Sequence, residues 1–331
     1  MSSKSKKLNK VIRYTVIVLA VLTLITSAIL LLQAWENKLG VYDDVNVTDT
    51  VVTHNGIEYE LKDNIETFLV LGLDKFDSDE VIESYNNDKQ ADFLMLFVFD
   101  NAAETCTAIH INRDTMVDIS VLGVAGNRID TVNKQIALAH TYGNGRDVSC
   151  RNTADSVSNL LLDMKVNHYV SVTMDSVAII NDHIGGVKVK VLDDFTGIDD
   201  TLVKGKTVTL KGDHALNYVR SRYGLYDSTN LNRMKRQQQY LEALYEKAIN
   251  LAENDEEFAV EALLKMADYI VSDRSISQLQ DLADKFIEYE FIGIKTLKGK
   301  SEVGEKHMEF YADEASVKEV VFDLFYNEKT K

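Results

Sequence analysis

The sequence predicts an α/β domain that follows a single N-terminal transmembrane helix, and three observations lead to this prediction. An uncharged, mostly apolar run at residues 14–32 comes directly after a basic N-terminus. From Thr67 onward, short apolar runs alternate with longer amphipathic segments, which is typical of an α/β fold. The rest of the chain, about 300 residues, shows no break in composition, so one large domain is favoured over two small ones.

The N-terminal apolar run has the length of a membrane-spanning helix. Its 19 residues would cover roughly 28 Å, close to the thickness of a bilayer's hydrocarbon core. Tyr14 and Trp35 are typical interfacial residues, and the basic segment before the run favours a cytoplasmic N-terminus. A cleaved signal peptide is the alternative, but its small-residue site at 26–28 lies inside the apolar run. We therefore expect a cytoplasmic basic segment at residues 1–13, a transmembrane helix at 14–33 and a single-pass protein of the cell membrane, with the remainder extracytoplasmic.

The periodicity of the remaining chain predicts its elements in order. We expect an extracytoplasmic stalk at residues 34–62, ending in a hairpin that turns at His54-Asn55-Gly56, and one domain at 63–328. Runs rich in β-branched and aromatic residues predict strands at 68–72, 93–99, 107–112, 169–174, 187–191, 207–210, 291–294 and 308–311. Helical spacing of apolar residues predicts helices at 132–142, 153–163, 175–183, 212–219, 231–252, 256–271, 276–289 and 314–326.

Positive charge is concentrated in one short region of an acidic protein. The formal net charge is −16, which argues against nucleic acid as a partner because nucleic-acid-binding proteins need a basic surface. Between residues 219 and 238, however, five cations face a single acid, Asp227. These cations are Arg220, Arg222, Arg233, Lys235 and Arg236.

The spacing of these cations places several of them side by side. Arg233, Arg236 and Gln237 stand at i, i+3 and i+4, which share one face of a helix. Arg220 and Arg222 stand at i and i+2, which align on an extended chain. Guanidinium groups held this close repel one another unless an anion lies between them, and their geometry suits phosphate oxygens. The alternative is an ordinary exposed face of a charged helix.

Two aspartates and an arginine are predicted to meet at one edge of the sheet. Asp92 opens a strand eight residues before Asp100, and Arg113 lies eight residues after Thr105 on the returning leg. An antiparallel hairpin would place Asp92 and Arg113 at the same edge, and Asp74 would join them if its strand is a neighbour. Two carboxylates so placed suit Mg²⁺, which takes one or two carboxylates together with phosphate oxygens. Ordinary turn chemistry is the alternative for each aspartate alone.

Cysteine and histidine usage gives no sign of a zinc site. The sequence holds two cysteines, Cys106 and Cys150, which would form a single disulfide in an exported domain or stay reduced. We state the disulfide as a hypothesis, because both residues lie in the predicted extracytoplasmic domain. The seven histidines show no metal-binding spacing.

Several motifs follow one another along the chain, and each alone would be weak. They are Gly72-Leu73-Asp74, Asp92, Arg113-Asp114-Thr115, the Asp-x-x-Gly-Gly-Val string at 182–187, the Gly-x-x-Ala-Leu-x-Tyr-Val-Arg-Ser-Arg string at 212–222 and the Arg-x-x-Arg-Gln-Gln string at 233–238. In this order, the sequence resembles the LytR-CpsA-Psr (LCP) family of membrane-anchored enzymes of Gram-positive bacteria. The match is clear from about residue 66 to residue 241 and extends more weakly to about residue 326.

The resemblance implies a phosphotransferase with an α/β/α sandwich around a central mixed β-sheet. Family members move a glycopolymer, such as teichoic acid or capsular polysaccharide, from an undecaprenyl-pyrophosphate carrier to a peptidoglycan hydroxyl. They hold the prenyl tail in an apolar tunnel beside the sheet, although the apolar helices of this sequence fit an ordinary core equally well. By position, Asp74 and Asp92 would bind Mg²⁺, with Mn²⁺ as an alternative.

The resemblance also implies roles for the polar residues of the predicted site. Arg113, Asp114 and Arg222 are expected to be catalytic, with Asp114 activating the acceptor or orienting Arg113. The predicted pyrophosphate-binding residues are Gln90, Arg113, Arg220, Arg222, Arg233, Arg236 and Gln237.

Several positions depart from the family pattern. Gln90 stands where the family usually has Arg, Phe93 where it has Thr, and Asn112 where it has Pro. Gln135 falls on the position of a family Lys. The loss of one cation favours an alternative function, a catalytically weak envelope regulator that binds lipid-linked pyrophosphates. A prenyl-pyrophosphate hydrolase, with water as the acceptor, is the other alternative.

Overall fold

The computed structural model describes residues 51–54, 56–73, 89–221, 230–252, 254–255, 257–305 and 307–329. All of these residues belong to one compact unit, residues 50–331. Within them, no helix is both long and apolar enough to cross a membrane. The predicted transmembrane segment, Asp74 and Arg222 lie outside the described residues.

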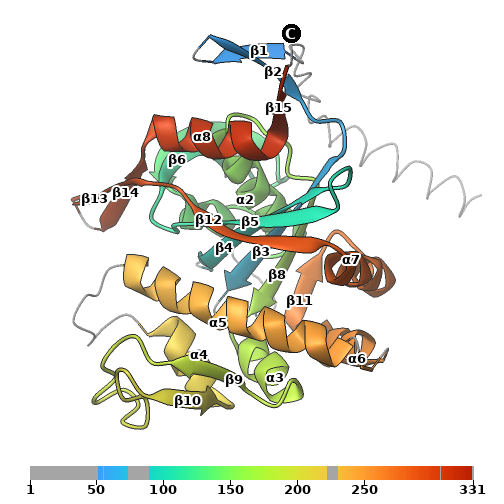
Figure 1. Ribbon diagram of the computed structural model, residues 1–331. Helices are drawn as coiled ribbons and strands as arrows, with labels where there is room; N and C mark the ends of the chain where they lie inside the picture. Colours follow the sequence, from blue (N-terminus) through green and yellow to red (C-terminus); the bar gives the residue numbers. More distant parts are fainter. Residues whose placement is uncertain are drawn as a thin grey trace, which may run out of the picture. The chain divides into compact units, whose positions relative to one another are not determined.

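A six-stranded mixed sheet forms the centre of this unit (Figure 1). The strand order is β11-β8-β3-β4-β5-β12. The pairs β3–β8 and β5–β12 are parallel, whereas β4 is antiparallel to both of its neighbours and β11 is antiparallel to β8. The predicted α/β fold with a central mixed sheet is confirmed. The strands are β3 (Ile65–Leu73), β4 (Ala91–Asp100), β5 (Thr105–Ile111), β8 (His168–Thr173), β11 (Ile270–Ser272) and β12 (Glu290–Thr296).

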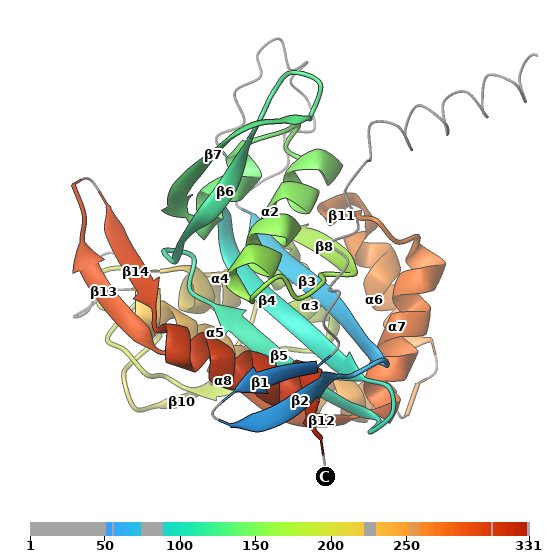
Figure 2. The same ribbon diagram turned by 90° about the horizontal axis from the view of Figure 1, so that it is seen from above.

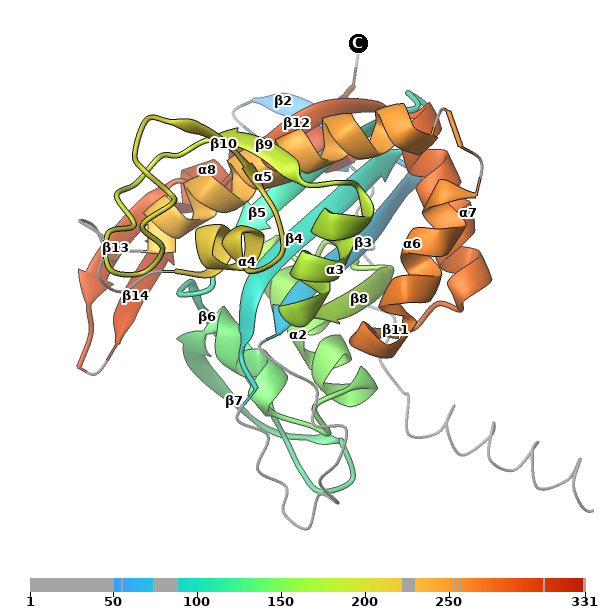
Figure 3. The ribbon, with the colours of Figure 1, turned by 90° about the horizontal axis from the view of Figure 1, so that it is seen from below.

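Alternating side chains let the sheet bury both of its faces. Leu69 and Leu71 of β3 pack into one core with α2 (Asp147–Leu160) and α8 (Glu314–Phe325), the helices in front of the sheet in Figure 2. Phe68 of β3 packs on the opposite face, which Figure 3 shows from the other side. The helices on that face are α3 (Asp175–His183), α5 (Asn230–Ala252), α6 (Phe258–Met266) and α7 (Ile276–Glu288).

Smaller strand pairs surround the central sheet. The hairpin of β9 and β10 packs with α4 and α5 around a second core that includes Phe195 and Tyr218. The predicted N-terminal hairpin of β1 and β2 is present, and β2 also pairs with the C-terminal strand β15. The bounds are β1 (Val51–His54), β2 (Ile57–Leu61), β6 (Met116–Leu122), β7 (Arg128–Gln135), β9 (Val187–Lys190), β10 (Thr207–Leu210), α4 (Asp213–Arg220), β13 (Gly299–Val303), β14 (Met308–Ala312) and β15 (Tyr326–Glu328).

Two predicted helices were wrong in part. Residues 132–142 form the end of β7 and then a 3-10 helix, η1 (Ile136–Thr141), because β6 supplies an antiparallel partner for β7. The helix predicted at 256–271 ends as α6 at Met266 and passes through the short 3-10 helix η2 (Ala267–Tyr269) into β11. In the first case the partner is the preceding strand of a hairpin, and in the second it is β8, about 100 residues earlier in the sequence. In both cases strand pairing outweighs the local helical pattern.

The disulfide hypothesis was also wrong. Both cysteines are free and buried. Cys106 of β5 packs in the core with Leu279, whereas Cys150 of α2 packs in the core on the opposite face of the sheet. The sheet therefore separates the two thiols, and no disulfide can form between them in this fold.

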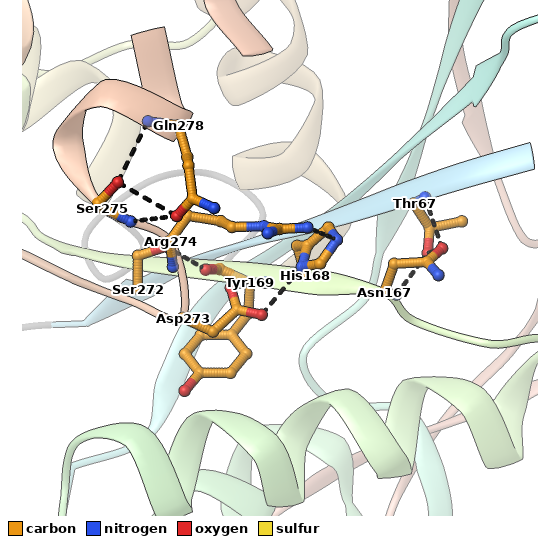
Figure 4. Close-up of polar contacts among 9 residues, drawn as sticks. All are labelled: Thr67, Asn167, His168, Tyr169, Ser272, Asp273, Arg274, Ser275 and Gln278. Atoms are coloured by element: carbon orange, nitrogen blue, oxygen red, sulfur yellow. Dashed lines mark hydrogen bonds and ion pairs between the residues drawn. The ribbon is translucent and has the colours of Figure 1, made fainter. Parts of the chain in front are cut away.

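Polar contacts hold the end of the sheet at which β8 begins (Figure 4). The Nδ1 of His168 lies 2.9 Å from an Asp273 carboxylate oxygen, and the backbone N–H of Tyr169 donates to the other oxygen. Nearby, the buried hydroxyl of Thr67 accepts the backbone N–H of Asn167 at 2.8 Å and donates to the carbonyl of Lys165 at 2.8 Å. These bonds fix the register between β3 and β8.

The Thr67 hydroxyl gives a direct test of this edge. Thr67→Val keeps the shape of the side chain but leaves the Asn167 N–H and the Lys165 carbonyl without this partner. We expect the free energy of unfolding to fall by about 1–3 kcal/mol. Thr67→Ser, which retains the hydroxyl, should cost less. Chemical denaturation of the full chain in detergent micelles would measure both, and equal losses would show that the hydroxyl does not matter.

Candidate functional site

The hairpin of β4 and β5 brings Asp92 and Arg113 together, as predicted. Leu94 pairs with Ile111, and the same register, continued two residues beyond this pair, places Asp92 opposite Arg113. The Arg113 guanidinium donates to the Asp92 carboxylate and to the side-chain oxygen of Gln90. The Arg113 side chain is only 12% exposed. One largely buried cation is therefore held between two acceptors at the opening of β4.

Asp114 completes the surroundings of Arg113. Its carboxylate lies 3.4 Å from the Arg113 Nε and accepts a hydrogen bond of 3.0 Å from the amide of Gln135. The same Gln135 amide donates to the Met308 carbonyl at 2.7 Å. Gln135 thus fixes the Asp114 carboxylate against β14. The sequence did not predict this role, and its only signal was that Gln135 replaces a family lysine.

The N-terminal turn of α5 is attached to the same strand ends. Arg233 is buried and donates to the backbone carbonyl of Asp92 at 3.2 Å. Asn230, the first residue of α5, donates to the side-chain oxygen of Asn112 at 2.6 Å. That oxygen also accepts the backbone N–H of Asp114 at 3.1 Å. Asn112 and Asn230 are therefore site residues that sequence reasoning missed, and the departure of Asn112 from the family's Pro was their only signal.

Arg236 and Gln237 contact α4 from the same helix. The Arg236 side chain is 1% exposed and donates to the Asp193 carboxylate and to the carbonyls of Tyr218 and Ser221. Gln237 donates to the carbonyl of Val219 at 3.1 Å. These bonds join α5 to the end of α4, where Arg220 is exposed. The described contacts of Arg236 are thus directed at α4 and Asp193, and the Arg113–Asp92 pair is held by Arg233.

The predicted metal ligands are described only in part. Asp92 is described, and its side chain is 18% exposed. Asp74 is outside the described residues, but Leu73, the residue before it, pairs with Ala91, the residue before Asp92. Over the described part of the chain, no group of three or more His, Cys, Asp or Glu side chains could hold a metal ion.

An apolar cavity lies on the α5 face of the sheet. Its volume is about 320 Å³, and its lining comes from β4, β12 and the helices α3, α5, α6 and α7. A second cavity of about 260 Å³ shares Phe97, Leu263 and Met266 with it. Met95 lines the first cavity three residues from Asp92, a separation of roughly 10 Å along a strand. Because strand side chains alternate, Asp92 and Met95 face opposite sides of the sheet, so the cavity and the arginine site adjoin along the backbone of β4 and not across one face.

Two buried histidines flank the site in neutral form. His110 of β5 packs against the ring of Phe93, at 5.0 Å between ring centroids. Burial, reinforced by the charge of Arg233, lowers the pKa of His110 to about 3. His140 of η1 is fully buried, and burial lowers its pKa to about 4. Neither ring contributes positive charge at neutral pH.

A family-wide sequence comparison agrees with these features. The profile described as "LytR_cpsA_psr family" matches residues 33–324. The chain belongs to the LytR-CpsA-Psr family. The resemblance predicted from its motifs is confirmed.

Individual relatives and solved structures show how far the similarity extends. The chain is 24% identical over 254 residues to the "polyisoprenyl-teichoic acid--peptidoglycan teichoic acid transferase TagU" of Bacillus licheniformis, covering 76% of this chain and 75% of that protein. Among solved structures, TagT bound to LI-WTA has a TM-score of 0.60 at 22% identity and covers 79% of this chain and 90% of that one. Protein gbs0355 of Streptococcus agalactiae has a TM-score of 0.64 at 19% identity, with coverages of 79% and 86%. At these identities the structures show that the fold is shared.

The buried Arg236 predicts a large stability effect. Arg236→Met would leave the Asp193 carboxylate and two carbonyls without their donor, and we expect a loss of about 3 kcal/mol in the free energy of unfolding. The matched control is Lys235→Met on the exposed face of α5, which should change stability by less than about 0.5 kcal/mol. Similar losses in the two variants would contradict a structural role for Arg236.

The two buried histidines predict an acid-sensitive fold. Their folded pKa values of about 3 and 4 lie below the ordinary value near 6.5, so between these limits the unfolded chain binds more protons than the folded one. Stability should therefore fall as the pH drops below about 6.5, with up to ~1.4 kcal/mol per pH unit from each histidine. Denaturation of His110→Asn and His140→Asn between pH 7 and 5 should give shallower slopes than the wild type. An unchanged slope in both would refute the prediction.

Proposed function

We propose that this protein transfers a glycopolymer, of the teichoic acid class, from an undecaprenyl-pyrophosphate carrier to peptidoglycan. The observation that carries the proposal is the Arg113 guanidinium fixed between Gln90, Asp92 and Asp114, with an apolar cavity whose lining begins three residues from Asp92 along β4. A lipid pyrophosphate has a pyrophosphate head and a long apolar tail. The arginine site suits the head, and the apolar cavity suits the tail. The name of the TagU relative supports the same reaction.

Arg113 and Arg233 would bind the pyrophosphate, together with Arg220 and Arg222. Phosphoryl transfer depends on positioning and on neutralising charge that spreads over the phosphate oxygens. Donors held in place before the substrate arrives supply this stabilisation without reorganisation. Arg113 fits this role because hydrogen bonds to Asp92 and Gln90 and an ion pair with Asp114 already fix its side chain. Arg236 and Gln237 would act indirectly, by holding the end of α4 and therefore Arg220 in position.

The cavity beside β4 would take the first part of the prenyl tail. Its lining is apolar throughout. Burying hydrocarbon there is therefore favourable by roughly 25 cal/mol for each Å² of apolar surface that is removed from water. The neighbouring cavity shares part of this lining and would extend the tail site along the sheet. A water-soluble sugar phosphate would gain nothing from either space.

Asp92 and Asp74 would hold Mg²⁺, with Mn²⁺ as an alternative. The residues fit such an ion in chemical type, because Mg²⁺ prefers hard carboxylate oxygens and takes one or two of them together with phosphate oxygens. In the sequence, Asp74 directly follows Leu73, which pairs with Ala91, the residue before Asp92. When bound, the ion would neutralise charge on the pyrophosphate. Asp114 is nearly buried and lies against Arg113 and Gln135, which favours orientation of Arg113 as its role. Activation of the acceptor hydroxyl is its alternative role.

The domain would work at the outer surface of the cell membrane, anchored by residues 14–33. An anchor of this kind keeps the site near a carrier that cannot leave the bilayer. Two further functions share the same site chemistry. A regulatory protein would bind the lipid pyrophosphate without turnover, which the absence of a cation at Gln90 favours, and a hydrolase would use water as acceptor.

The central test is transfer by the full chain in detergent micelles with Mg²⁺. Given an undecaprenyl-pyrophosphate-linked glycan and peptidoglycan, the wild type should release undecaprenyl phosphate and attach the glycan to peptidoglycan. Arg113→Gln should lower kcat by on the order of 10²-fold or more, because a fixed cation at the reacting phosphates is lost. The matched control is Arg128→Gln, which removes an exposed arginine of β7 and should leave the rate unchanged.

Three outcomes would separate the candidate functions. Release of undecaprenyl phosphate with the glycan bound to peptidoglycan supports the transferase. Release with free glycan supports the hydrolase. Tight binding without release, for teichoic acid and capsular donors alike, would reject both enzymes in favour of the regulatory protein.

A further inference from the structure

The 3-10 helix η1 touches both chain segments that meet in the Arg113 site. The backbone N–H of Ala137 donates to the carbonyl of Arg113 at 3.1 Å. The Nδ1 of His140, one turn later, lies 3.1 Å from the carbonyl of Lys89. Lys89 directly precedes Gln90, whose side chain accepts from Arg113. One short element therefore fixes the backbone on both sides of the contact between Gln90 and Arg113.

The contacts of His140 determine where its proton lies. A backbone carbonyl can only accept, so the Nδ1 must carry the proton and donate it to Lys89. The Nε2 is then an acceptor, and the Sγ of Cys150 lies 3.7 Å from it. The thiol is the donor in this contact. Burial raises the pKa of Cys150 to about 12, so the thiol keeps its proton at neutral pH.

Ser171 completes the chain of contacts behind Cys150. Its hydroxyl lies 3.4 Å from the Sγ and 3.4 Å from the carbonyl of Val271. The thiol is placed to donate to this hydroxyl as well as to the Nε2 of His140, and the Ser171 hydroxyl donates to the Val271 carbonyl. The side chains of Ser171, Cys150 and His140 are all fully buried, so water does not compete for these bonds. This series of side-chain contacts therefore connects β8, through α2 and η1, to the backbone of Lys89.

We propose that His140, held as its Nδ1–H tautomer by the Cys150 thiol, is a positioning residue that fixes the Lys89–Gln90 segment and thereby the Arg113 guanidinium. The proposal rests on the proposed function only for its effect on turnover. A small displacement of a group that must face the reacting phosphates can lower the rate about 10²-fold. His140 does not touch the substrate in this role and acts through Gln90.

Substitutions at His140 separate hydrogen bonding from packing. His140→Asn keeps an N–H near the position of Nδ1, whereas His140→Leu keeps apolar bulk and loses the donor. In the transfer reaction of the full chain in detergent micelles, His140→Leu should lower kcat about tenfold or more, with a smaller change in the KM for the lipid donor. His140→Asn should recover most of the rate. Equal rates in both variants would overturn the proposal.

Two substitutions at Cys150 provide a parallel test. Cys150→Ser keeps a donor to the Nε2 of His140, and Cys150→Ala removes it. We expect Cys150→Ser to stay within about threefold of the wild type and Cys150→Ala to follow His140→Leu. A Cys150→Ala variant with wild-type kcat would show that the thiol does not hold the histidine.

A double-mutant cycle tests whether His140 acts through Gln90. In a Gln90→Ala background, the contact with Arg113 is already lost, so His140→Leu should reduce kcat little further. Its effect on the midpoint of thermal unfolding should remain in both backgrounds. If His140→Leu lowers kcat equally with and without Gln90, its role is structural and the proposal fails.

A final measurement does not depend on transfer activity. Nitrogen-15 NMR of selectively labelled histidine in the full chain should show a neutral His140 with its proton on Nδ1 at pH 7. Titration with farnesyl pyrophosphate should give a Kd about tenfold weaker for His140→Leu than for His140→Asn. An Nε2–H tautomer or equal Kd values would overturn the positioning role. A chain that meets both expectations but transfers no glycan would instead reject the proposed function and leave this inference standing.

Discussion

The antiparallel pairing of β4 with β5 is the constraint on which the site depends. It places Asp92 and Arg113 at the same edge of the sheet and lets one guanidinium contact the side chains of Gln90, Asp92 and Asp114. Most of this arginine is removed from water, and an ion pair in such surroundings is stable only when further hydrogen bonds satisfy it. The surrounding bonds from Gln135 and Arg233 meet that condition for Asp114 and for the backbone of Asp92. The geometry of the site is therefore set before any ligand binds.

The long helix α5 serves two regions at once. Its first turn holds the strand ends through Asn230 and Arg233, and the next turn holds α4 through the buried Arg236. Farther along, its apolar face lines the cavity over β4. One rigid element thus relates the arginine site, the Arg220 region and the apolar cavity. This arrangement suits a ligand with a charged head and an apolar tail, as the proposed transfer requires.

Local pattern determined much of the fold. Strands β3, β4 and β5 are buried on both faces and contain continuous apolar runs, and α5 has helical spacing along its whole length, so each was predicted within a few residues. The residues at 132–142 and at 267–271 were assigned to helices because their apolar spacing fits a helix. Pairing with β6, the preceding strand of a hairpin, and with β8, which lies about 100 residues away, decided the outcome. Such pairing energy cannot be read from a short window of sequence.

The sequence by itself determined the family, the polar motifs and the meeting of Asp92 with Arg113, because equal hairpin legs fix a register. Only the tertiary structure decided what each side chain contacts. It directed Arg236 toward Asp193 and α4, separated Cys106 from Cys150 by the thickness of the sheet, and brought Gln135, Asn112 and Asn230 into the site. The physical reason is that motif spacing fixes the neighbours of a residue along the chain, whereas burial, hydrogen-bond partners and the face of a sheet depend on elements that pack from far away in the sequence.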